Sequence, residues 1–194
     1  GEAVVEVLNR AGVRVVFPEG QTCCGAPARY GGCPEAAAEA AAVNAGALTG
    51  VKADYIVSAC PTCTVALKND FGELLATHGT GEDREKAAEV AARTMDFSTL
   101  VLELARQGRL EFEDATQAST LTYHDSCHLK RTLGVSDQPR ALLSMAGHGI
   151  REMAEADVCC GMGGSYSVKL PSVSRAVLDR KLTHIGETGA EAVA

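Results

Sequence analysis

A Cys-Cys-Gly triplet organises this sequence and occurs twice, as Cys23-Cys24-Gly25 and as Cys159-Cys160-Gly161. Adjacent cysteines rarely form a disulfide with each other, because the ring that closes is strained. Along extended backbone their side chains point in opposite directions, so the two thiolates of a pair can reach two irons of one cluster. The duplicated triplet therefore predicts two metal or redox centres.

The sequence around the triplets repeats with a shift of 136 residues, the separation of Cys24 and Cys160. In both copies a glycine-closed helical pattern precedes a short strand-like run, at residues 13–17 and 150–153. A second strand-like run at residues 55–58 follows the first triplet, and residues 192–194 begin its counterpart. Strands that alternate with helices predict an α/β fold of two pseudo-repeated lobes with mostly parallel sheets, and the cysteines fall in loops at strand ends.

The repeat also predicts the domain organisation. We expect a first lobe over residues 1–108, a linker over residues 109–119 and a second lobe over residues 120–194. The repeat places the counterpart of Cys127 before Gly1, and that of the Cys-x-x-Cys motif at residues 60–63 just past Ala194. We therefore expect the first lobe to lack its N-terminal cysteine segment and the second its C-terminal Cys-x-x-Cys segment, unless the two ends have diverged.

Helical patterns connect these strands. We expect helices at residues 34–48, 64–77, 83–106 with a join near Asp96, and 171–185, and a strand at residues 121–124. The first of these helices has Pro34 at its first position and is rich in alanine, which favours close packing on a sheet.

The composition argues against two classes of partner. The 194 residues include 18 Lys and Arg against 25 Asp and Glu, a net charge of −7, which opposes binding to nucleic acid or to anionic lipid. The most apolar stretch, residues 36–51, is too short and too polar to span a bilayer. Residues that follow Gly1 resemble neither a secretory signal nor a transit peptide. We expect a cytoplasmic protein with no nucleic-acid partner and no membrane span.

Seven of the eight cysteines form two expected ligand sets. The first set is Cys23, Cys24, Cys60 and Cys63, and the second is Cys127, Cys159 and Cys160. Iron–sulfur clusters need thiolates from several loops and backbone N–H groups directed at the sulfurs. The paired cysteines are followed by Gly25 and Gly161, where the main chain can approach a cofactor closely, and Gly163 and Gly164 continue the second loop as an anion-cradling nest.

Two residues near the ligand sets receive other roles. His128 adjoins Cys127, and we expect it to support the cofactor loop by hydrogen bonding rather than to ligate metal. Cys33 stands outside the repeat, just before Pro34, and we expect it to cap a helix or to be a buried thiol. No Ser-His-Asp order or helical His-x-x-x-His motif is present, so no catalytic residue is assigned.

Two other chemistries remain open for the thiols. Zinc accepts four sulfurs tetrahedrally, and Cys60 and Cys63 have a spacing that is frequent in zinc sites. A thioredoxin-like redox pair also places Cys-x-x-Cys between a strand and a helix, as the residues around Cys60 predict. That scheme has no place for the duplicated triplet.

Three stretches together resemble the cysteine-rich CCG-domain iron–sulfur proteins. They are Phe17-Pro18-Glu19-Gly20-Gln21-Thr22-Cys23-Cys24-Gly25, Tyr123-His124-Asp125-Ser126-Cys127-His128 and Asp157-Val158-Cys159-Cys160-Gly161-Met162-Gly163-Gly164-Ser165-Tyr166-Ser167. This family includes the cysteine-rich subunit of heterodisulfide reductase, the glycolate oxidase iron–sulfur subunit and the lactate-utilisation iron–sulfur subunit. The resemblance spans essentially the whole chain, and residues 87–102 and 163–167 are most similar to the lactate-utilisation subunit.

The resemblance implies a 4Fe-4S type cluster in each lobe, bound by one upstream cysteine, the adjacent pair and a Cys-x-x-Cys. It assigns the two ligand sets above to two such clusters. This sequence departs from the pattern, because the first lobe lacks the upstream cysteine and the second lobe lacks the Cys-x-x-Cys motif. The chain itself therefore leaves open whether it holds both clusters, neither cluster or zinc instead.

The resemblance also implies a function. It points to an electron-transfer subunit of a complex that oxidises a 2-hydroxyacid, L-lactate in particular, with partners among the other subunits of a lactate or glycolate oxidation system. Such a subunit relays electrons rather than acting alone as an enzyme. The alternatives are a heterodisulfide-reductase-like subunit that reduces disulfides at its clusters, and a structural zinc-binding module.

Overall fold

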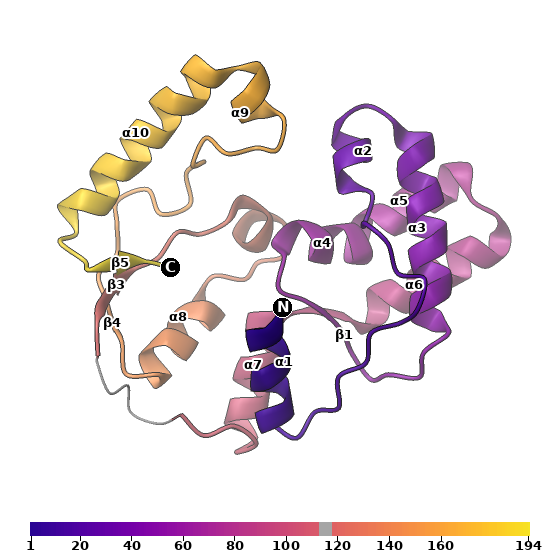
Figure 1. Cartoon of the computed structure of the whole chain (residues 1–194), viewed down its shortest axis with the longest axis horizontal. Helices are drawn as coiled ribbons and strands as arrows, with labels where there is room; N and C mark the ends of the chain where they lie inside the picture. Colours follow the sequence, from indigo (N-terminus) through magenta and orange to yellow (C-terminus); the bar gives the residue numbers. More distant parts are fainter. Residues whose placement is uncertain (113–117) are drawn as a thin grey trace. The chain divides into compact units, whose positions relative to one another are not determined.

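A computed structural model describes residues 1–112 and 118–194 of the chain (Figure 1). Within them the chain divides into two compact units, unit 1 (Gly1–Arg109) and unit 2 (Leu110–Ala194). Each unit combines helices with short parallel strands, which confirms the predicted α/β class. The expected linker, residues 109–119, includes residues 113–117, which lie outside the described residues.

Unit 1 surrounds a parallel pair of strands with helices. The strands are β1 (Ile56–Ser58) and β2 (Thr94–Asp96). The helices are α1 (Glu2–Arg10), α2 (Ala26–Tyr30), α3 (Pro34–Thr49), α4 (Pro61–Val65), the π-helical turn η1 (Ala66–Asp70), α5 (Phe71–His78), α6 (Gly81–Arg93) and α7 (Phe97–Arg106). The expected strand at residues 13–17 does not form, and no described segment pairs with these residues.

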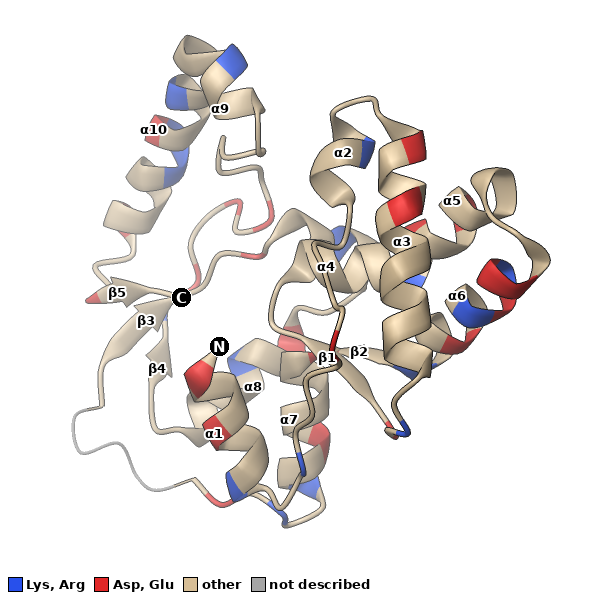
Figure 2. Ribbon diagram, turned by 45° about the vertical axis from the view of Figure 1, so that its right-hand side comes forward, with Lys and Arg blue, Asp and Glu red and all other residues tan. Residues whose placement is uncertain are grey.

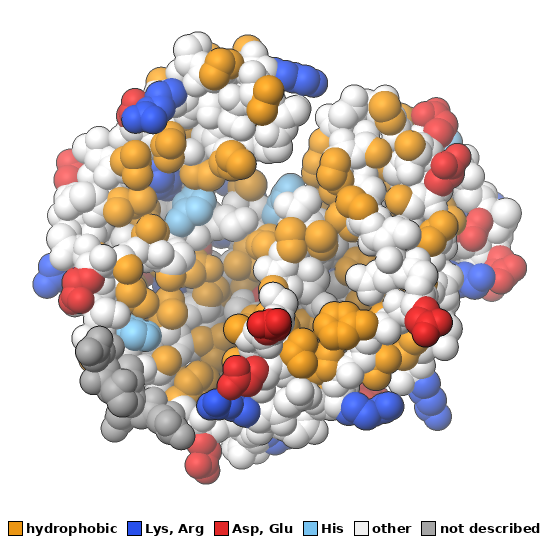
Figure 3. All heavy atoms as spheres, in the orientation of Figure 1, with side chains coloured by type: hydrophobic (Ala, Val, Ile, Leu, Met, Phe, Trp, Pro, Cys, Tyr) orange, Lys and Arg blue, Asp and Glu red, His pale blue; other side chains and the backbone are white. Residues whose placement is uncertain are grey.

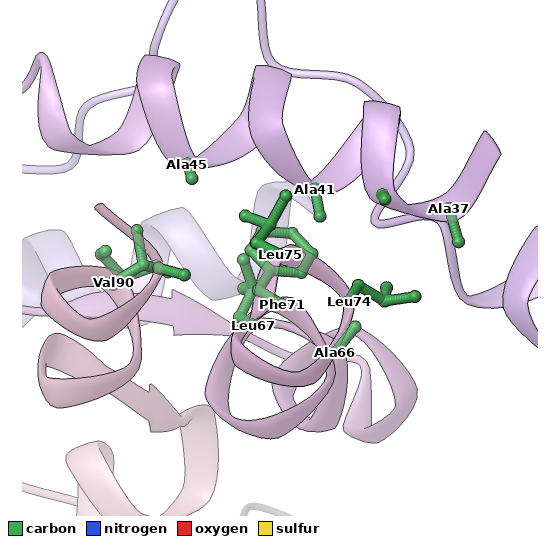
Figure 4. Close-up of a cluster of buried hydrophobic side chains, with 12 residues drawn as sticks. Ala37, Ala41, Ala45, Ala66, Leu67, Phe71, Leu74, Leu75 and Val90 are labelled. Carbon is green, nitrogen blue, oxygen red and sulfur yellow. The ribbon is translucent and has the colours of Figure 1, made fainter. Parts of the chain in front are cut away.

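The core of unit 1 lies between helices that are close together in sequence (Figure 4). Ala37, Ala41 and Ala45 form a stripe on α3 that has no side-chain bulk. Phe71 and Val90, from α5 and α6, fill the space beside this stripe and are fully buried. The small side chains thus let α3 approach two helices closely, whereas the sequence favoured close packing on a sheet.

The predicted helix over residues 83–106 is interrupted near Asp96, as expected, but the interruption contains strand β2. Asp96 ends the strand and caps α7, because its side chain accepts hydrogen bonds from the backbone N–H groups of Ser98 and Thr99 at 3.0 and 3.1 Å. The preceding helix, α6, is rich in acidic and basic residues (Figure 2), and Glu82 and Lys86 in its first turns pair at 2.6 Å.

Unit 2 contains a three-stranded parallel sheet with the order β4-β3-β5. Its elements are β3 (Thr120–Thr122), the π-helical turn η2 (His128–Thr132), α8 (Asp137–Met145), β4 (Gly149–Ile150), α9 (Tyr166–Lys169), α10 (Pro171–Glu187) and β5 (Ala192–Val193). The central strand β3 pairs on both edges: Leu121 lies opposite Ile150 on one side and opposite Ala192 on the other. Backbone pairing continues past β3, because the His124 N–H donates to the carbonyl of Ala194 at 2.9 Å.

The internal repeat is visible in the backbone. Helices α1 and α8 both end in a left-handed glycine, Gly12 with φ 69° and Gly147 with φ 85°. After each glycine the next N–H returns to the helix, from Val13 to the Leu8 carbonyl at 2.9 Å and from His148 to the Leu143 carbonyl at 3.1 Å. Within the described residues, no helix has the length and apolar character required to cross a membrane.

Candidate metal centres

The Cys-x-x-Cys motif lies where β1 ends and α4 begins. Cys60 is the N-cap of α4, and Pro61 occupies the first helical position. Burial disfavours the Cys60 thiolate, but hydrogen bonds from Cys63 and Thr62 outweigh burial and lower the pKa of Cys60 below its ordinary value. The start of α4 therefore directs backbone N–H groups at a sulfur, an arrangement that stabilises a thiolate ligand.

Cys63 interacts with two other thiols of the first predicted set, Cys24 and Cys60. Burial raises the pKa of the Cys63 thiol well above its ordinary value, and hydrogen bonding and charge interaction with Cys24 and Cys60 raise it further. Cys24 is half-buried against the hydrophobic core of unit 1, whereas Cys23 is exposed. Unit 1 thus brings together Cys24, Cys60 and Cys63 from two loops and leaves the Cys23 side chain open to solvent.

A buried amide holds the first triplet loop. Asn44 on α3 is 2% exposed. Its side-chain nitrogen donates to the Cys23 carbonyl at 2.9 Å, and its oxygen accepts the Thr22 N–H at 2.9 Å. Gly25 then turns the chain with φ 79°, and a Cβ at this position would lie 3.0 Å from the Ala37 carbonyl oxygen. Glycine is required here by both the left-handed backbone and the close approach of α3.

The second triplet is held in the same way by α10. Gly161 has φ 81°, and a Cβ there would overlap with the backbone carbonyl of Ser174. The ammonium of Lys181, a residue only 4% exposed, donates to the carbonyls of Glu155 and Ala156 at 2.5 and 3.2 Å, just before the paired cysteines. Burial lowers the pKa of Lys181, while its charge interacts favourably with Cys160.

These contacts occupy matching positions in the two units. Helices α3 and α10 both begin at a proline, Pro34 and Pro171. The residue that contacts the triplet glycine comes three positions later, and the buried polar residue comes ten positions later, Asn44 in unit 1 and Lys181 in unit 2. The sequence analysis did not single out Asn44 or Lys181. A signal was present, because each lies ten residues after the proline that begins its helix.

Backbone contacts bring the Cys127 loop beside the second triplet. The Asp125 N–H donates to the Ala156 carbonyl at 3.1 Å, and His124 Nδ1 lies 3.1 Å from the same oxygen. On the other side of Cys127, Arg131 donates to the Asp157 carbonyl at 3.0 Å. The described residues of unit 2 form no thiol–thiol contact like that around Cys63, but the Gly161 N–H donates to Cys159 Sγ at 3.3 Å.

A buried charge network fixes the loop that carries Cys127. The Asp125 carboxylate, 1% exposed, accepts hydrogen bonds from Arg140 at 2.8 and 3.0 Å and from Ser136 Oγ at 2.8 Å. Burial opposes the charge, but the hydrogen bonds from Arg140 and Ser136 outweigh it and hold the pKa of Asp125 at about 2. The Arg140 guanidinium also lies 4.6 Å above the Tyr123 ring. This network is the second feature that the sequence did not reveal.

The remaining predicted residues take varied positions. Gly163 and Gly164 lie in the loop between Gly161 and α9, and Gly164 has φ 53° with open space at its Cβ position. His128 is half-buried and is the first residue of η2. Cys33 is the exposed N-cap residue of α3, so it is not a buried thiol.

The donor chemistry of unit 1 is of the kind that an iron–sulfur centre needs, and unit 2 offers one N–H group directed at a cysteine sulfur. Thiols from separate loops are directed toward one another in unit 1, and backbone N–H groups point at Cys60 and Cys159. Among residues 1–112 and 118–194, no three His, Cys, Asp or Glu side chains are already arranged as ligands around one point. Because Cys127 and Cys159 are exposed, their side chains have room to move toward a centre.

Comparison with known proteins identifies the family. The model of the CCG cysteine-rich domain matches residues 1–68 and 121–194. This chain belongs to the CCG cysteine-rich domain family. The resemblance that the motifs carried is therefore confirmed, and the family model finds one CCG segment in each unit.

Several curated relatives match almost the whole length of this chain. Lactate utilization protein A 1 of Bacillus anthracis is 36% identical over 191 residues, which cover 98% of this chain and 76% of the relative. Lactate utilization protein A of Geobacillus kaustophilus is 36% identical over 192 residues, with 98% and 77% covered. Lactate utilization protein A 2 of Bacillus cereus strain Q1 is 35% identical over 191 residues.

Proposed function

We propose that this protein is an iron–sulfur subunit that relays electrons during the oxidation of a 2-hydroxyacid, with L-lactate as the substrate of the complex. The interaction of Cys63 with both Cys24 and Cys60 carries the proposal, because an iron–sulfur cluster takes its thiolate ligands from separate segments of the chain. The similarity to lactate utilization protein A supports lactate over other hydroxyacids. Eight free thiols favour a cytoplasmic location, where cysteines stay reduced.

Each unit contributes its own ligands in this proposal. Cys23, Cys24, Cys60 and Cys63 would hold a centre in unit 1, and Cys127, Cys159 and Cys160 would ligate one in unit 2, each a 4Fe-4S type cluster. Such a cluster, when bound, accepts and releases single electrons. The chain's own residues set the conditions for this chemistry: N–H groups at Cys60 and Cys159 stabilise thiolates, and the glycine loops at residues 25 and 161–164 bring backbone donors close.

Residues in both units also position the loops that carry the cysteines. Asn44 holds the backbone at the first cysteine of its pair, and Lys181 holds the backbone a few residues before the second pair, so the thiolates are presented from defined loops. His128 would support the second centre from the start of η2, next to Cys127. In this proposal a partner subunit oxidises the hydroxyacid, and this subunit receives the electrons.

The direct test is metal analysis of the protein purified without oxygen. We expect a brown protein that contains iron and inorganic sulfide. A Cys24→Ser variant should lose about half of the iron, because one of two thiolate-ligated centres is disrupted. The Cys33→Ser variant is the matched control: Cys33 is an exposed cysteine outside both ligand sets, so the iron content should stay unchanged.

The electron-relay role needs a second measurement. Addition of L-lactate together with the partner subunits should bleach the visible absorption, whereas L-lactate without them should not. A colourless protein with stoichiometric zinc would overturn the proposal in favour of a structural zinc module. Turnover of a small disulfide by the isolated subunit would instead point to disulfide reduction at its centres.

A further inference from the structure

Unit 1 contains an apolar groove between two stretches of backbone that do not pair with each other. The groove has a volume of about 480 Å³. One wall is formed by residues 13–18 and the other by residues 55–59, which include the whole of β1. Val5 and Leu8 of α1 and Leu100 of α7 also line it. Figure 3 shows hydrophobic side chains gathered on the surface between α1 and β1.

On both sides of the groove, the backbone has an edge that pairs with no strand among the described residues. Among the described residues, none forms a backbone hydrogen bond with residues 14–17. β1 pairs with β2 along one edge, and its sheet has no further strand in the described part of the chain. Val16, Phe17 and Tyr55 are 43%, 73% and 43% exposed, which is high for large apolar side chains beside a core.

The internal repeat shows what the groove lacks. In unit 2, β4 and β5 are the counterparts of residues 13–17 and of β1, and β3 lies between them, hydrogen-bonded to both. There the Arg151 N–H donates to the Leu121 carbonyl at 2.8 Å and the Ala194 N–H to the Thr122 carbonyl at 2.9 Å. Unit 1 has both outer neighbours of this arrangement but no central strand. By the repeat, the counterpart of β3 lies upstream of Gly1.

We propose that the groove is a strand-acceptor site, filled in the parent polypeptide by an extended apolar segment from upstream of Gly1. The segment joins as a parallel strand between residues 13–17 and β1. Insertion gives unit 1 the order of unit 2, continued by β2, so that four parallel strands form one sheet. The curated relatives have room for such a segment, because the matched region covers 76% of their length.

The occupant's chemistry follows from the walls. Strands buried in the middle of a parallel sheet are continuous apolar runs, and valine, leucine and tyrosine side chains make up much of the groove's lining, with Arg14, Lys52, Asp54 and Arg109 also around it. The occupant contributes backbone donors and acceptors to both walls, and its carboxyl end reaches the same sheet edge as β1. That edge carries Cys60, so the residues after the occupant enter the loop region of the first centre.

Hydrogen exchange tests the proposal independently of any metal. The parent polypeptide with its native upstream residues and the chain that begins at Gly1 are compared by amide exchange. In the parent, amides of residues 14–17 should exchange at least about tenfold more slowly, because they enter a ladder. The Arg151 amide, already bonded to Leu121, is the internal control and should exchange slowly in both proteins. Equal exchange of residues 14–17 in the two proteins would overturn the proposal.

A pair of variants separates groove filling from general stabilisation. Val16→Asp places a carboxylate in the groove, and Val43→Asp places one at a similarly exposed valine on α3, outside the groove. Val16→Asp should lower the thermal stability of the parent but not that of the chain that begins at Gly1, whereas Val43→Asp should change neither. If protection of residues 14–17 rises with protein concentration, a second copy fills the groove and the proposal fails.

Discussion

At the scale of single residues, the triplet glycines are fixed by packing as much as by cofactor chemistry. Gly25 and Gly161 both adopt left-handed backbone, and both have their Cα against a helix that begins at a proline. An added methyl group therefore meets a backbone carbonyl, which cannot rotate away as a side chain can. The requirement for glycine after the cysteine pair follows from this contact even without metal.

We expect Gly161→Ala to lower the free energy of unfolding by about 2–5 kcal/mol, because left-handed strain adds to overlap with the Ser174 carbonyl. Gly134→Ala is the matched control in the same unit: Gly134 has φ 70° but open space at its Cβ position. Gly134→Ala should lower the free energy of unfolding by only about 1–2 kcal/mol. Urea denaturation measures both values, and equal losses would contradict the packing argument.

The Asp125 network gives a second prediction at this scale. Arg140→Leu should lower the free energy of unfolding by about 3–5 kcal/mol, because it leaves a buried carboxylate without its main partner. Arg175→Leu is the control, since Arg175 is 71% exposed in its pair with Asp179. That change should stay within about 0.5 kcal/mol. Similar losses for the two variants in urea denaturation would show that the buried network stabilises the fold no more than an exposed ion pair does.

At the scale of elements, α6 has a reciprocal cap. The Thr80 side chain accepts the Asp83 N–H at 3.2 Å, and the Asp83 carboxylate accepts the Thr80 N–H at 2.9 Å. Thr80→Ala should lower the free energy of unfolding by about 1 kcal/mol. Thr77→Ala, at an exposed threonine of α5, should have a smaller effect in the same denaturation experiment.

The same cap gives α6 a defined dependence on pH. Hydrogen bonds from the Thr80 backbone and side chain lower the pKa of Asp83 below 3.8. The stabilisation is therefore complete above the ordinary carboxyl pKa and is lost as pH falls through the lowered value. The protection factors of amides at the start of α6, which correct for the pH dependence of intrinsic exchange, should fall in acid in the unmodified protein, with a smaller change in an Asp83→Asn variant. An identical acid response in both would refute the assignment.

The first residues of helices were the part of the fold that the sequence predicted best. Pro34 and Pro171 each begin a helix as expected, because proline is favoured at the first helical position. Strands were less predictable, since a strand exists only when a neighbour pairs with it. Residues 13–17 have a strand pattern and no partner among the described residues, whereas β2 has three residues, too few for a periodic signal.

The candidate site was predictable in its ligands and not in their supports. The spacing of Cys60 and Cys63 and the paired cysteines were visible directly in the sequence. Asn44 and Lys181 were not, because a polar residue within a helix is usually exposed, and only the fold shows that these two face the triplet loops. Whether the seven predicted cysteines and His128 serve a cofactor stays a prediction.

At the scale of the whole molecule, the duplication is not symmetric in charge. Asn44 holds the first triplet loop with a neutral amide, whereas Lys181 holds the second with an ammonium that interacts with Cys160. A nearby positive charge favours the reduced, more negative state of a redox centre. If both proposed centres are present, the one in unit 2 should therefore be easier to reduce.

We expect Lys181→Met to lower the reduction potential of the second centre by about 40 mV, which corresponds to about 1 kcal/mol for one electron. Lys181→Arg keeps the charge and should retain most of the potential. Redox titration of the parent polypeptide, followed by electron paramagnetic resonance, measures the change. An unchanged potential in the Met variant, with iron content preserved, would remove Lys181 from this role.

The parallel pairing in unit 2 also has a consequence during synthesis on the ribosome. Thr122 in β3 and its partner Val193 in β5 are 71 residues apart. At roughly 5–20 residues per second, the nascent chain waits about 4–14 s between the emergence of one strand and that of the other. During this interval one edge of β3 has no partner. The nascent chain is therefore a candidate client for ribosome-associated chaperones.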